Sequence, residues 1–208
     1  MRLAAVPDSR LVSADAAAAA PLPAPAPAGV RVIRNLRPGV DWNTCGQAAI
    51  ATLLARFALG PFAPGTASPS DGEAIDLVCR DFPPDLPFGL GTTAWRLCAA
   101  LRHRGLGVEH VHSGWFGRNA EGALDRLRDH LDHGLPAIVC LDHGRLDGPA
   151  WSGHWAVALG MDAALVHLGN NGPAGDLPLE VFMHAWRCRH LPFAHNHCAL
   201  LARREATP

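Results

Sequence analysis

The sequence contains no lysine and no tyrosine; its 18 basic residues are all arginine, and with 19 acidic residues the net charge is -1. The missing lysine excludes any mechanism that depends on a lysine Schiff base. The nearly balanced charge offers no basic excess that would attract nucleic acid or an anionic membrane surface. We therefore expect neither nucleic acid nor a membrane as a partner.

Long apolar runs are also missing, because no 18 consecutive residues are apolar, and we expect no membrane-spanning helix. The alanine stretch near the N-terminus imitates a signal peptide, but acidic residues interrupt it and prolines break it. The expected location is the cytoplasm. None of the cysteines forms a Cys-x-x-Cys pair, and in a reducing cytosol most should be free, buried thiols.

The chain divides into two parts by composition. Residues 1–29 are rich in alanine and proline and cannot bury enough apolar surface to offset the entropy of ordering, so we expect a disordered tail. Residues 30–208 should form one domain. Overall, 49% hydrophobic and 18% charged residues are typical of a folded globular protein.

Hydrophobic periodicity predicts helices in the first part of the domain and strands in the second. Helices are expected over 45–58, 71–82, 92–105 (with a threonine cap and a glycine stop), 120–134 and, late in the chain, 177–186. Strands are expected over 30–36, 108–112, 136–142, 154–170 (two strands with a turn at 161–163) and 197–204. This order predicts an α+β fold with a mostly antiparallel sheet.

The stretch DWNTCGQAAIATLLARFALG, residues 41–60, places Cys45 between a polar turn and an apolar helix. Unpaired amide groups and the helix dipole at a helix N-terminus favour negative charge and lower the pKa of a thiol. Gly46 would let the backbone approach the group above the sulfur. Cys45 is therefore a candidate nucleophile, and the alternative is an inert core thiol.

A candidate base and a candidate orienting group follow later in the chain. SGHWAVALG places His154 at the start of a strand, and LGNNGPAGD places Asn170 and Asn171 at the end of the next strand, with Asp176 further on. Adjacent antiparallel strands would bring Asn170 close to His154. An imidazole base whose tautomer is fixed by a third group is the arrangement that activates a thiol.

Three segments resemble papain-like cysteine peptidases, and most closely the bacteriocin-processing, double-glycine branch: NTCGQAAIATLLARFALG, LRDHLDHGLPAIVCLD and GHWAVALGMDAALVHLGNNGPAGDLPLEVFMHAW. The resemblance implies a buried nucleophile helix in an N-terminal helical part, packed on a C-terminal, mostly antiparallel sheet. It also implies a catalytic triad of Cys45, His154 and Asn170 with no metal or organic cofactor, and a peptide or acyl substrate. Asn170 stands where the family usually has aspartate.

One departure from the family concerns the oxyanion donor. The family usually carries glutamine six residues before the cysteine, and position 39 is glycine here. The side chain of Asn43, Asn35 or Gln47 could supply that donor, and the backbone amide of Cys45 would be the second. The neighbours Trp42, Gly153 and Trp155 are candidate substrate contacts.

The resulting hypothesis is a hydrolase that cleaves an amide or thioester through an acyl-enzyme on Cys45. Two alternatives remain open: an acyltransferase or cyclase that uses the same three residues, and a non-enzymatic binding module on a degenerate peptidase fold. A zinc site is a further alternative for a C-terminal cluster in which His184 and Cys188 would share a helix face. The members of this cluster are His184, Cys188, His190, His195, His197 and Cys198.

Overall fold

A computed structural model describes most of the predicted domain. The described residues are 30–35, 42–85, 91–114, 116–146, 153–170, 175–188 and 196–205. The predicted tail, residues 1–29, lies outside them.

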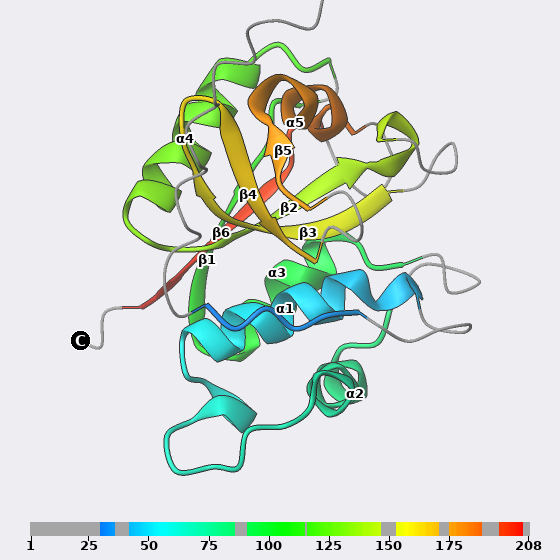
Figure 1. The fold of residues 1–208 in the computed structure, drawn as a ribbon. Coiled ribbons are helices and arrows are strands. Elements are labelled where there is room, and N and C mark those ends of the chain that lie inside the picture. Colours follow the sequence, from blue (N-terminus) through cyan, green and yellow to red (C-terminus); the bar gives the residue numbers. More distant parts are fainter. Residues whose placement is uncertain are drawn as a thin grey trace, which may run out of the picture.

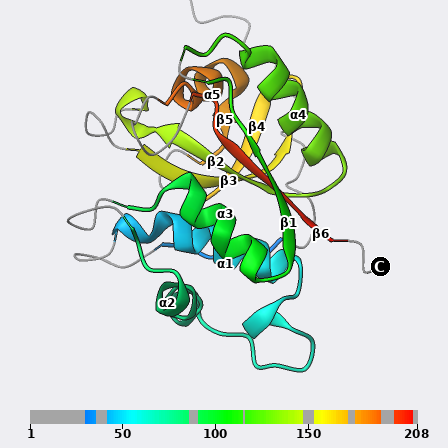
Figure 2. The ribbon, with the colours of Figure 1, turned by 180° about the vertical axis from the view of Figure 1, so that it is seen from behind.

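The core of the fold is one sheet in the order β1-β6-β2-β3-β4-β5, in which every neighbouring pair is antiparallel. The strands are β1 (Leu106–Val111), β2 (Ala137–Asp142), β3 (Gly153–Met161), β4 (Leu165–Gly169), β5 (Leu177–Pro178) and β6 (Ala199–Arg204). The edge strand β1 pairs with the last strand, so the two cross the molecule together (Figure 2).

Helices cover both faces of this sheet (Figure 1). One face packs against α1 (Cys45–Arg56) and α3 (Ala94–His103), and α2 (Asp71–Asp81) packs against α1 on the side away from the sheet. The other face packs against α4 (Ala120–Asp132) and α5 (Leu179–Trp186). The predicted α+β fold, with its nucleophile helix packed on an antiparallel sheet, is confirmed.

The first helix is enclosed by the rest of the domain. Every residue of α1 from Cys45 to Leu54 is buried, and the helix contacts α2, α3 and β3. Its small residues Ala48, Ala49 and Ala51 are fully buried, which lets neighbouring elements approach closely. By length and composition Cys45–Phe62 could cross a membrane, but 61% of this segment is buried inside the domain, as in a core helix.

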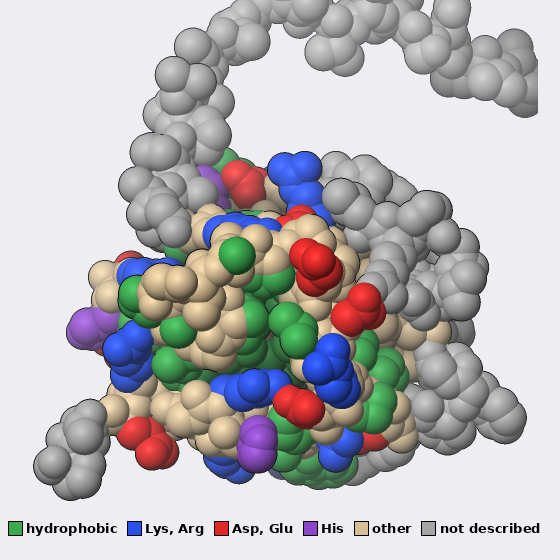
Figure 3. Space-filling view, turned by 90° about the horizontal axis from the view of Figure 1, so that it is seen from below, with side chains coloured by type: hydrophobic (Ala, Val, Ile, Leu, Met, Phe, Trp, Pro, Cys, Tyr) green, Lys and Arg blue, Asp and Glu red, His purple; other side chains and the backbone are tan. Residues whose placement is uncertain are grey.

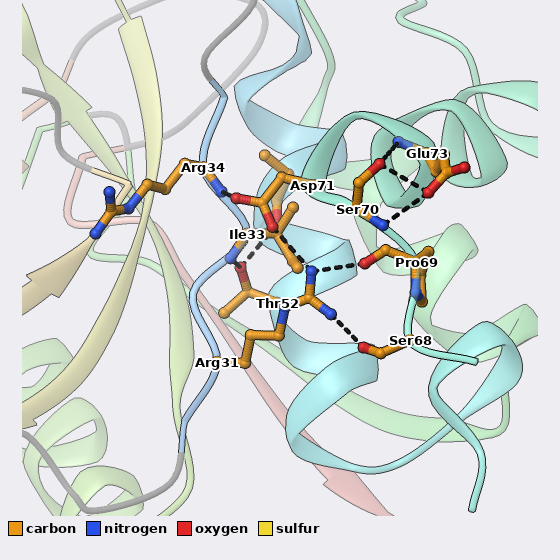
Figure 4. Close-up of polar contacts among 10 residues, drawn as sticks. Arg31, Ile33, Arg34, Thr52, Ser68, Pro69, Ser70, Asp71 and Glu73 are labelled. Atoms are coloured by element: carbon orange, nitrogen blue, oxygen red, sulfur yellow. Dashed lines mark hydrogen bonds and ion pairs between the residues drawn. The ribbon is translucent and has the colours of Figure 1, made fainter. Parts of the chain in front are cut away.

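The predicted strand at residues 30–36 is wrong, because residues 30–35 are extended but join no sheet. Side chains hold this segment instead (Figure 4). The Ile33 amide donates to Thr52 Oγ1 on α1 at 3.0 Å, and the Arg34 amide donates to Asp71 Oδ2 at 3.1 Å. Arg31 forms an ion pair with Asp71 at 3.0 Å. These contacts bring Asn35 to the start of α1.

Capping residues fix the starts of α2 and α3, and the threonine cap and glycine stop predicted for the helix at 92–105 are confirmed. Ser70 and Glu73 form a capping box at α2 (Figure 4), and Thr93 Oγ1 accepts a hydrogen bond from the Arg96 amide at 3.2 Å at α3. Gly105 follows α3 with φ +80°, a left-handed conformation that suits glycine. The late helix is a correction, because Leu177 and Pro178 form β5 and α5 begins only at Leu179.

The surface seen from the side of α2 carries arginine and acidic side chains next to one another, with apolar side chains between them (Figure 3). The ion pairs Arg31–Asp71 and Arg104–Asp81 belong to this side of the molecule. Neither sign of charge dominates this face, as expected from the net charge of -1.

Candidate active site

Cys45 lies at the junction of two helices and a strand. A 3-10 turn, Trp42–Thr44, leads into α1, and Cys45 is the first residue of that helix. Its side chain is 5% exposed, and its sulfur accepts a hydrogen bond from the Trp155 amide of β3 at 3.5 Å. A Cβ on Gly46 would lie 2.9 Å from Leu97 Cδ2 and 3.3 Å from Trp155 Cδ1. Glycine is therefore needed for the close approach of α1 to α3 and to β3.

The thiol of Cys45 is not activated in the way the sequence suggested. Burial raises the pKa of Cys45 above its ordinary value. The backbone amides of Trp155, Gly46 and Cys45 favour the thiolate, but they do not outweigh burial. The expected lowering of the Cys45 pKa is thus wrong for this structure, and the resting sulfur is a protonated thiol near neutral pH.

His154 is the second residue of β3, directly before Trp155. Its Nε2 makes a short hydrogen bond with the backbone carbonyl oxygen of Asn170. A carbonyl only accepts, so Nε2 carries the proton and Nδ1 carries the lone pair. Burial lowers the pKa of His154, which keeps the imidazole neutral near pH 7 and able to accept a proton.

Asn170 reaches His154 through its backbone rather than through its side chain. The residue follows β4 with φ +59°, a left-handed conformation that asparagine tolerates better than most residues. This conformation presents its carbonyl to His154. The predicted proximity of Asn170 and His154 is therefore present, but the side-chain contact that the resemblance implied is replaced by a main-chain contact.

The Asn170 side chain instead ties three segments together. Its Oδ1 accepts a hydrogen bond from the Asn35 amide at 3.2 Å, and its Nδ2 lies 3.5 Å from the carbonyl oxygens of Cys45 and Trp155. Asn35 Oδ1 in turn accepts from Thr44 Oγ1 at 2.9 Å. This network links the N-terminal segment, the start of α1 and the start of β3.

Cys45, His154 and Asn170 lie close together, but hydrogen bonds do not connect all three in the order that a catalytic triad requires. Among the described residues no hydrogen bond joins the Cys45 sulfur to His154, and the sulfur's partner is the Trp155 amide. Catalytic hydrogen bonds are often long or misaligned before substrate binds. Asp176 is not an alternative orienting group, because its Oδ2 lies 2.9 Å from His167 Nδ1. Asn171 lies outside the described residues.

The candidate oxyanion donors differ in whether their side chains already make hydrogen bonds. Gln47 is fully buried, and its Nε2 donates to the Phe82 carbonyl at 3.1 Å and to Thr92 Oγ1 at 2.9 Å. Its carboxamide is thus committed to holding α1 against neighbouring loops, which corrects its assignment as an oxyanion donor. Asn43 is half-buried two residues before Cys45, and its side chain has no hydrogen bond with another described residue.

The substrate-contact candidates also differ. Trp155 is buried, with its Nε1 donating to the Thr92 carbonyl at 2.8 Å, so its side chain supports the core and only its amide reaches the sulfur. That placement corrects its assignment as a side-chain contact. Gly153 is exposed at the start of β3. The side chain of Trp42 lies outside the described part of the structure.

The C-terminal cluster does not form the helix face that a zinc site was expected to use. The helix α5 ends at Trp186, so Cys188 lies beyond it. Within the described residues no group of three histidine, cysteine or acidic side chains is placed to hold a metal ion, and His190 and His195 lie outside them. Cys188 instead lies with its sulfur 3.7 Å from that of Cys140. All six cysteines lie among the described residues and none forms a disulfide, and all but Cys79 are buried.

His143 is the residue that the sequence reasoning missed. It begins a 3-10 turn, His143–Arg145, directly after β2, and its ring stacks on that of His154 with centroids 4.3 Å apart and an interplanar angle of 29°. The position of His143 directly after β2 was an indication of this contact in the sequence. In the β2–β3 ladder Leu141 pairs with His154, so a histidine two residues later lies near the catalytic candidate.

Solved structures with the same fold as this chain are known. The peptidase domain of Streptococcus ComA, a bifunctional ABC transporter, is 16% identical over 81% of this chain and 96% of that chain, with a TM-score of 0.51. A double glycine motif protease from an AMS/PCAT transporter, in complex with a leader peptide, is 18% identical over 86% of this chain and 94% of that chain, with a TM-score of 0.51. The chain has the fold of the double-glycine peptidases.

A third neighbour of this double-glycine peptidase fold is a C39-like peptidase from Bacillus anthracis. It is 13% identical over 86% of this chain and 96% of that chain, with a TM-score of 0.56. No protein-family model and no curated protein sequence matches the chain. The predicted resemblance to the double-glycine branch is thus confirmed at the level of the fold.

Buried thiols and buried histidines should together confine maximal stability to a window between about pH 6.5 and 8.5, the ordinary pKa values of histidine and cysteine. Burial lowers the pKa values of His130, His154 and His197. Below the window the unfolded chain binds protons that the folded domain does not, so stability falls with falling pH. Burial raises the pKa of Cys45, and it raises that of Cys198 strongly. Above the window the unfolded chain loses thiol protons that the folded domain keeps, so stability falls with rising pH.

Urea unfolding midpoints at pH 5.5, 7.5 and 9.5 measure this window. The Cys198→Ala variant should lose less stability between pH 7.5 and 9.5 than the wild type does. A midpoint that is equally high at pH 7.5 and 9.5 in the wild type would contradict the raised thiol pKa values.

Proposed function

We propose that the protein is a cysteine peptidase that cleaves a peptide bond through an acyl-enzyme on Cys45. The observation that carries the proposal is the start of β3, where the Trp155 amide donates to the Cys45 sulfur. The residue before it, His154, is neutral and is held there by the Asn170 carbonyl. The fold shared with peptidase domains supports this reading.

The raised pKa of Cys45 favours general-base catalysis over a preformed thiolate–imidazolium pair. The Cys45 proton moves to His154 Nδ1 while the sulfur bonds to the scissile carbonyl carbon. The carbonyl π electrons pass to oxygen. When the carbon–nitrogen bond breaks, His154 returns the proton to the leaving amine and a thioester remains on Cys45. Water then attacks the thioester with His154 as base, and the thiolate regains a proton as the acid leaves.

Two groups near the sulfur are suited to stabilise the oxyanion of this reaction. The backbone amide of Cys45 opens α1 and, like the amides of Trp155 and Gly46, favours negative charge beside the sulfur. The side chain of Asn43 is the second, because Asn43 lies in the turn that leads into α1 and its side chain makes no hydrogen bond with another described residue. Together they would replace the glutamine that the family usually carries at the position of Gly39.

The proposed substrate is a peptide with a Gly-Gly pair at the cleavage point, following the double glycine motif named for one structural neighbour. The test is incubation of the purified protein with a set of Gly-Gly-X peptides in H₂¹⁸O, followed by mass spectrometry. Cleavage after Gly-Gly with one ¹⁸O in the new carboxyl group supports hydrolysis. An acyl product joined to an added amine instead of water would indicate an acyltransferase or cyclase.

Substitution of Asn170 tests whether its backbone carbonyl or its side chain orients His154. Asn170→Gly keeps the left-handed backbone and the carbonyl that accepts from His154, so kcat/KM should fall by no more than about 10-fold. A side-chain orienting group would show a loss of about 10⁴-fold, as when a triad acid is replaced. The measurement is kcat/KM of wild type, Asn170→Gly and Asn170→Ala on the cleaved peptide.

The Asn170→Ala variant is the control for this experiment. Alanine is strained at φ +59° and also lacks the bond to the Asn35 amide, so Asn170→Ala should be less stable and less active than Asn170→Gly. Equal losses of about 10⁴-fold in both variants would assign the orienting role to the side chain.

A non-enzymatic binding module is the second candidate function. Its support is that Cys45 is 5% exposed, has a raised pKa and has no hydrogen bond with His154 in the described structure. This candidate predicts that Gly-Gly peptides bind but are not cleaved, and that binding is equal in wild type and Cys45→Ala. Calorimetric titration of both proteins with an uncleaved peptide measures this directly.

A further inference from the structure

The stack of His143 on His154 has no part in the reaction written above. The two ring centroids are 4.3 Å apart, close enough for van der Waals contact between the rings over one face of each. The β2–β3 ladder brings them together, because Leu141 pairs with His154 and Asp142 pairs with Gly153. The contact therefore follows from the register of two central strands.

The turn that carries His143 is anchored on both sides. Asp142 Oδ1 accepts from the Gly144 amide at 3.0 Å, and Asp142 Oδ2 lies 3.3 Å from Arg145 Nε. Arg145 also donates from a terminal nitrogen to the His184 carbonyl of α5 at 3.0 Å. His143 is thus held on a braced turn between the sheet and α5, and its ring can act as a fixed surface.

We infer that His143 is a positioning residue for His154, which it holds by its ring face while the Asn170 carbonyl holds the same ring by Nε2. Two constraints that act on the face and on one edge leave the imidazole little freedom to rotate. Nδ1, which has no hydrogen bond with any described residue, is then presented in one orientation as the base. The inference rests on the proposed function and adds one residue to it.

The stack also couples the protonation of the two rings. Two imidazolium charges at this separation repel each other, so the second proton binds more weakly than the first and the rings titrate as a pair. The turn, β2 and α5 carry these other titratable or charged groups: Cys140, Asp142, Arg145, Glu180 and His184. The other elements packed against β3 add Cys45 and Arg56 on α1, His167 on β4, and Glu121, Asp125, Arg126, Arg128, Asp129, His130 and Asp132 on α4. His154 is the only titratable group of β3.

The test compares His143→Ala, which removes the stack, with His143→Phe, which keeps a ring face but cannot take a proton. His184→Ala is the matched control, since it removes a nearby exposed histidine of α5. In His143→Ala we expect kcat to fall by about 10-fold with KM unchanged, as for a loss of orientation rather than of substrate contacts. In His143→Phe and His184→Ala kcat should stay within about 3-fold of wild type, since the orientation of His154 is retained.

The second readout is the NMR titration of the His154 ring, which needs no substrate. It should show two steps in wild type and in His184→Ala, and a single step in both His143 variants. A titration of His154 that is the same in all four proteins, or a His143→Ala variant with wild-type kcat, would overturn the inference.

The two readouts distinguish this inference from the proposed function. A wild-type protein that cleaves no Gly-Gly peptide but shows the coupled titration would overturn the peptidase proposal and support the stack. A wild-type protein that cleaves the peptide, with unchanged His143 variants, would overturn the positioning role alone.

Discussion

Peptide cleavage should fall by about 10⁵-fold or more in Cys45→Ala, because removal of a nucleophile leaves only the contribution of oxyanion donors and substrate binding. Alanine is a suitable replacement, since Cys45 is buried and its sulfur is contacted by backbone amides, of which that of Trp155 lies 3.5 Å away. The fold should persist, because α1 keeps Gly46 and its packing against Leu97 and Trp155. The measurement is kcat/KM on the Gly-Gly peptide, with circular dichroism to verify folding.

Matched controls for this loss are available among the other thiols. Cys98 is a buried core cysteine on α3, and Cys79 is the half-buried cysteine of α2. Cys98→Ala and Cys79→Ala should keep cleavage within about 3-fold of wild type, since neither thiol touches the site. If Cys45→Ala cleaved as fast as these controls, another nucleophile would have to be sought.

The second large effect is expected at His154. His154→Ala should lower kcat/KM by about 10³-fold near pH 7, because general-base assistance contributes about 10²- to 10⁴-fold. Since burial raises the Cys45 pKa, the variant should recover activity steadily as the pH rises above 8.5, the ordinary thiol pKa, when hydroxide ionises the sulfur without the imidazole. The wild type should show no comparable rise, because its base is already neutral at pH 7.

Added imidazole provides a further arm of the same experiment. A small base that enters the space left in His154→Ala should restore part of the activity near pH 7, and it should not affect Cys45→Ala. A His154→Ala variant whose kcat/KM matched wild type at pH 7 would contradict the assignment of His154 as the base.

Local sequence signals predicted most of the fold because they depend on neighbouring residues. The apolar run after Cys45, the Thr93 cap and the turn between β3 and β4 all correspond to observed elements. At that turn Asp162 Oδ1 accepts from the Ala164 and Leu165 amides at 2.7 Å each, a local interaction that the sequence encodes directly. The extended segment at 30–35 was assigned to a strand because its residues suit one, but its partners are side chains of distant helices.

The site was predicted less completely, because its properties arise from tertiary packing. The position of Cys45 at a helix N-terminus followed from the sequence, whereas its raised pKa depends on its burial in the folded domain. The place of Asn170 after β4 also followed, but its left-handed backbone turns the carbonyl rather than the amide toward His154. Gln47 looked available in the sequence because its partners, Phe82 and Thr92, lie far along the chain.

The central claim is that Cys45 carries the acyl group during turnover, and the most direct test is to trap that intermediate. The wild-type protein is mixed with a Gly-Gly peptide thioester, quenched in acid after short intervals and mapped by peptide mass spectrometry. We expect one acyl group, on Cys45, formed much faster than any adduct on the half-buried Cys79. Acylation of Cys79 alone, or cleavage that proceeds while Cys45 stays unmodified, would contradict it.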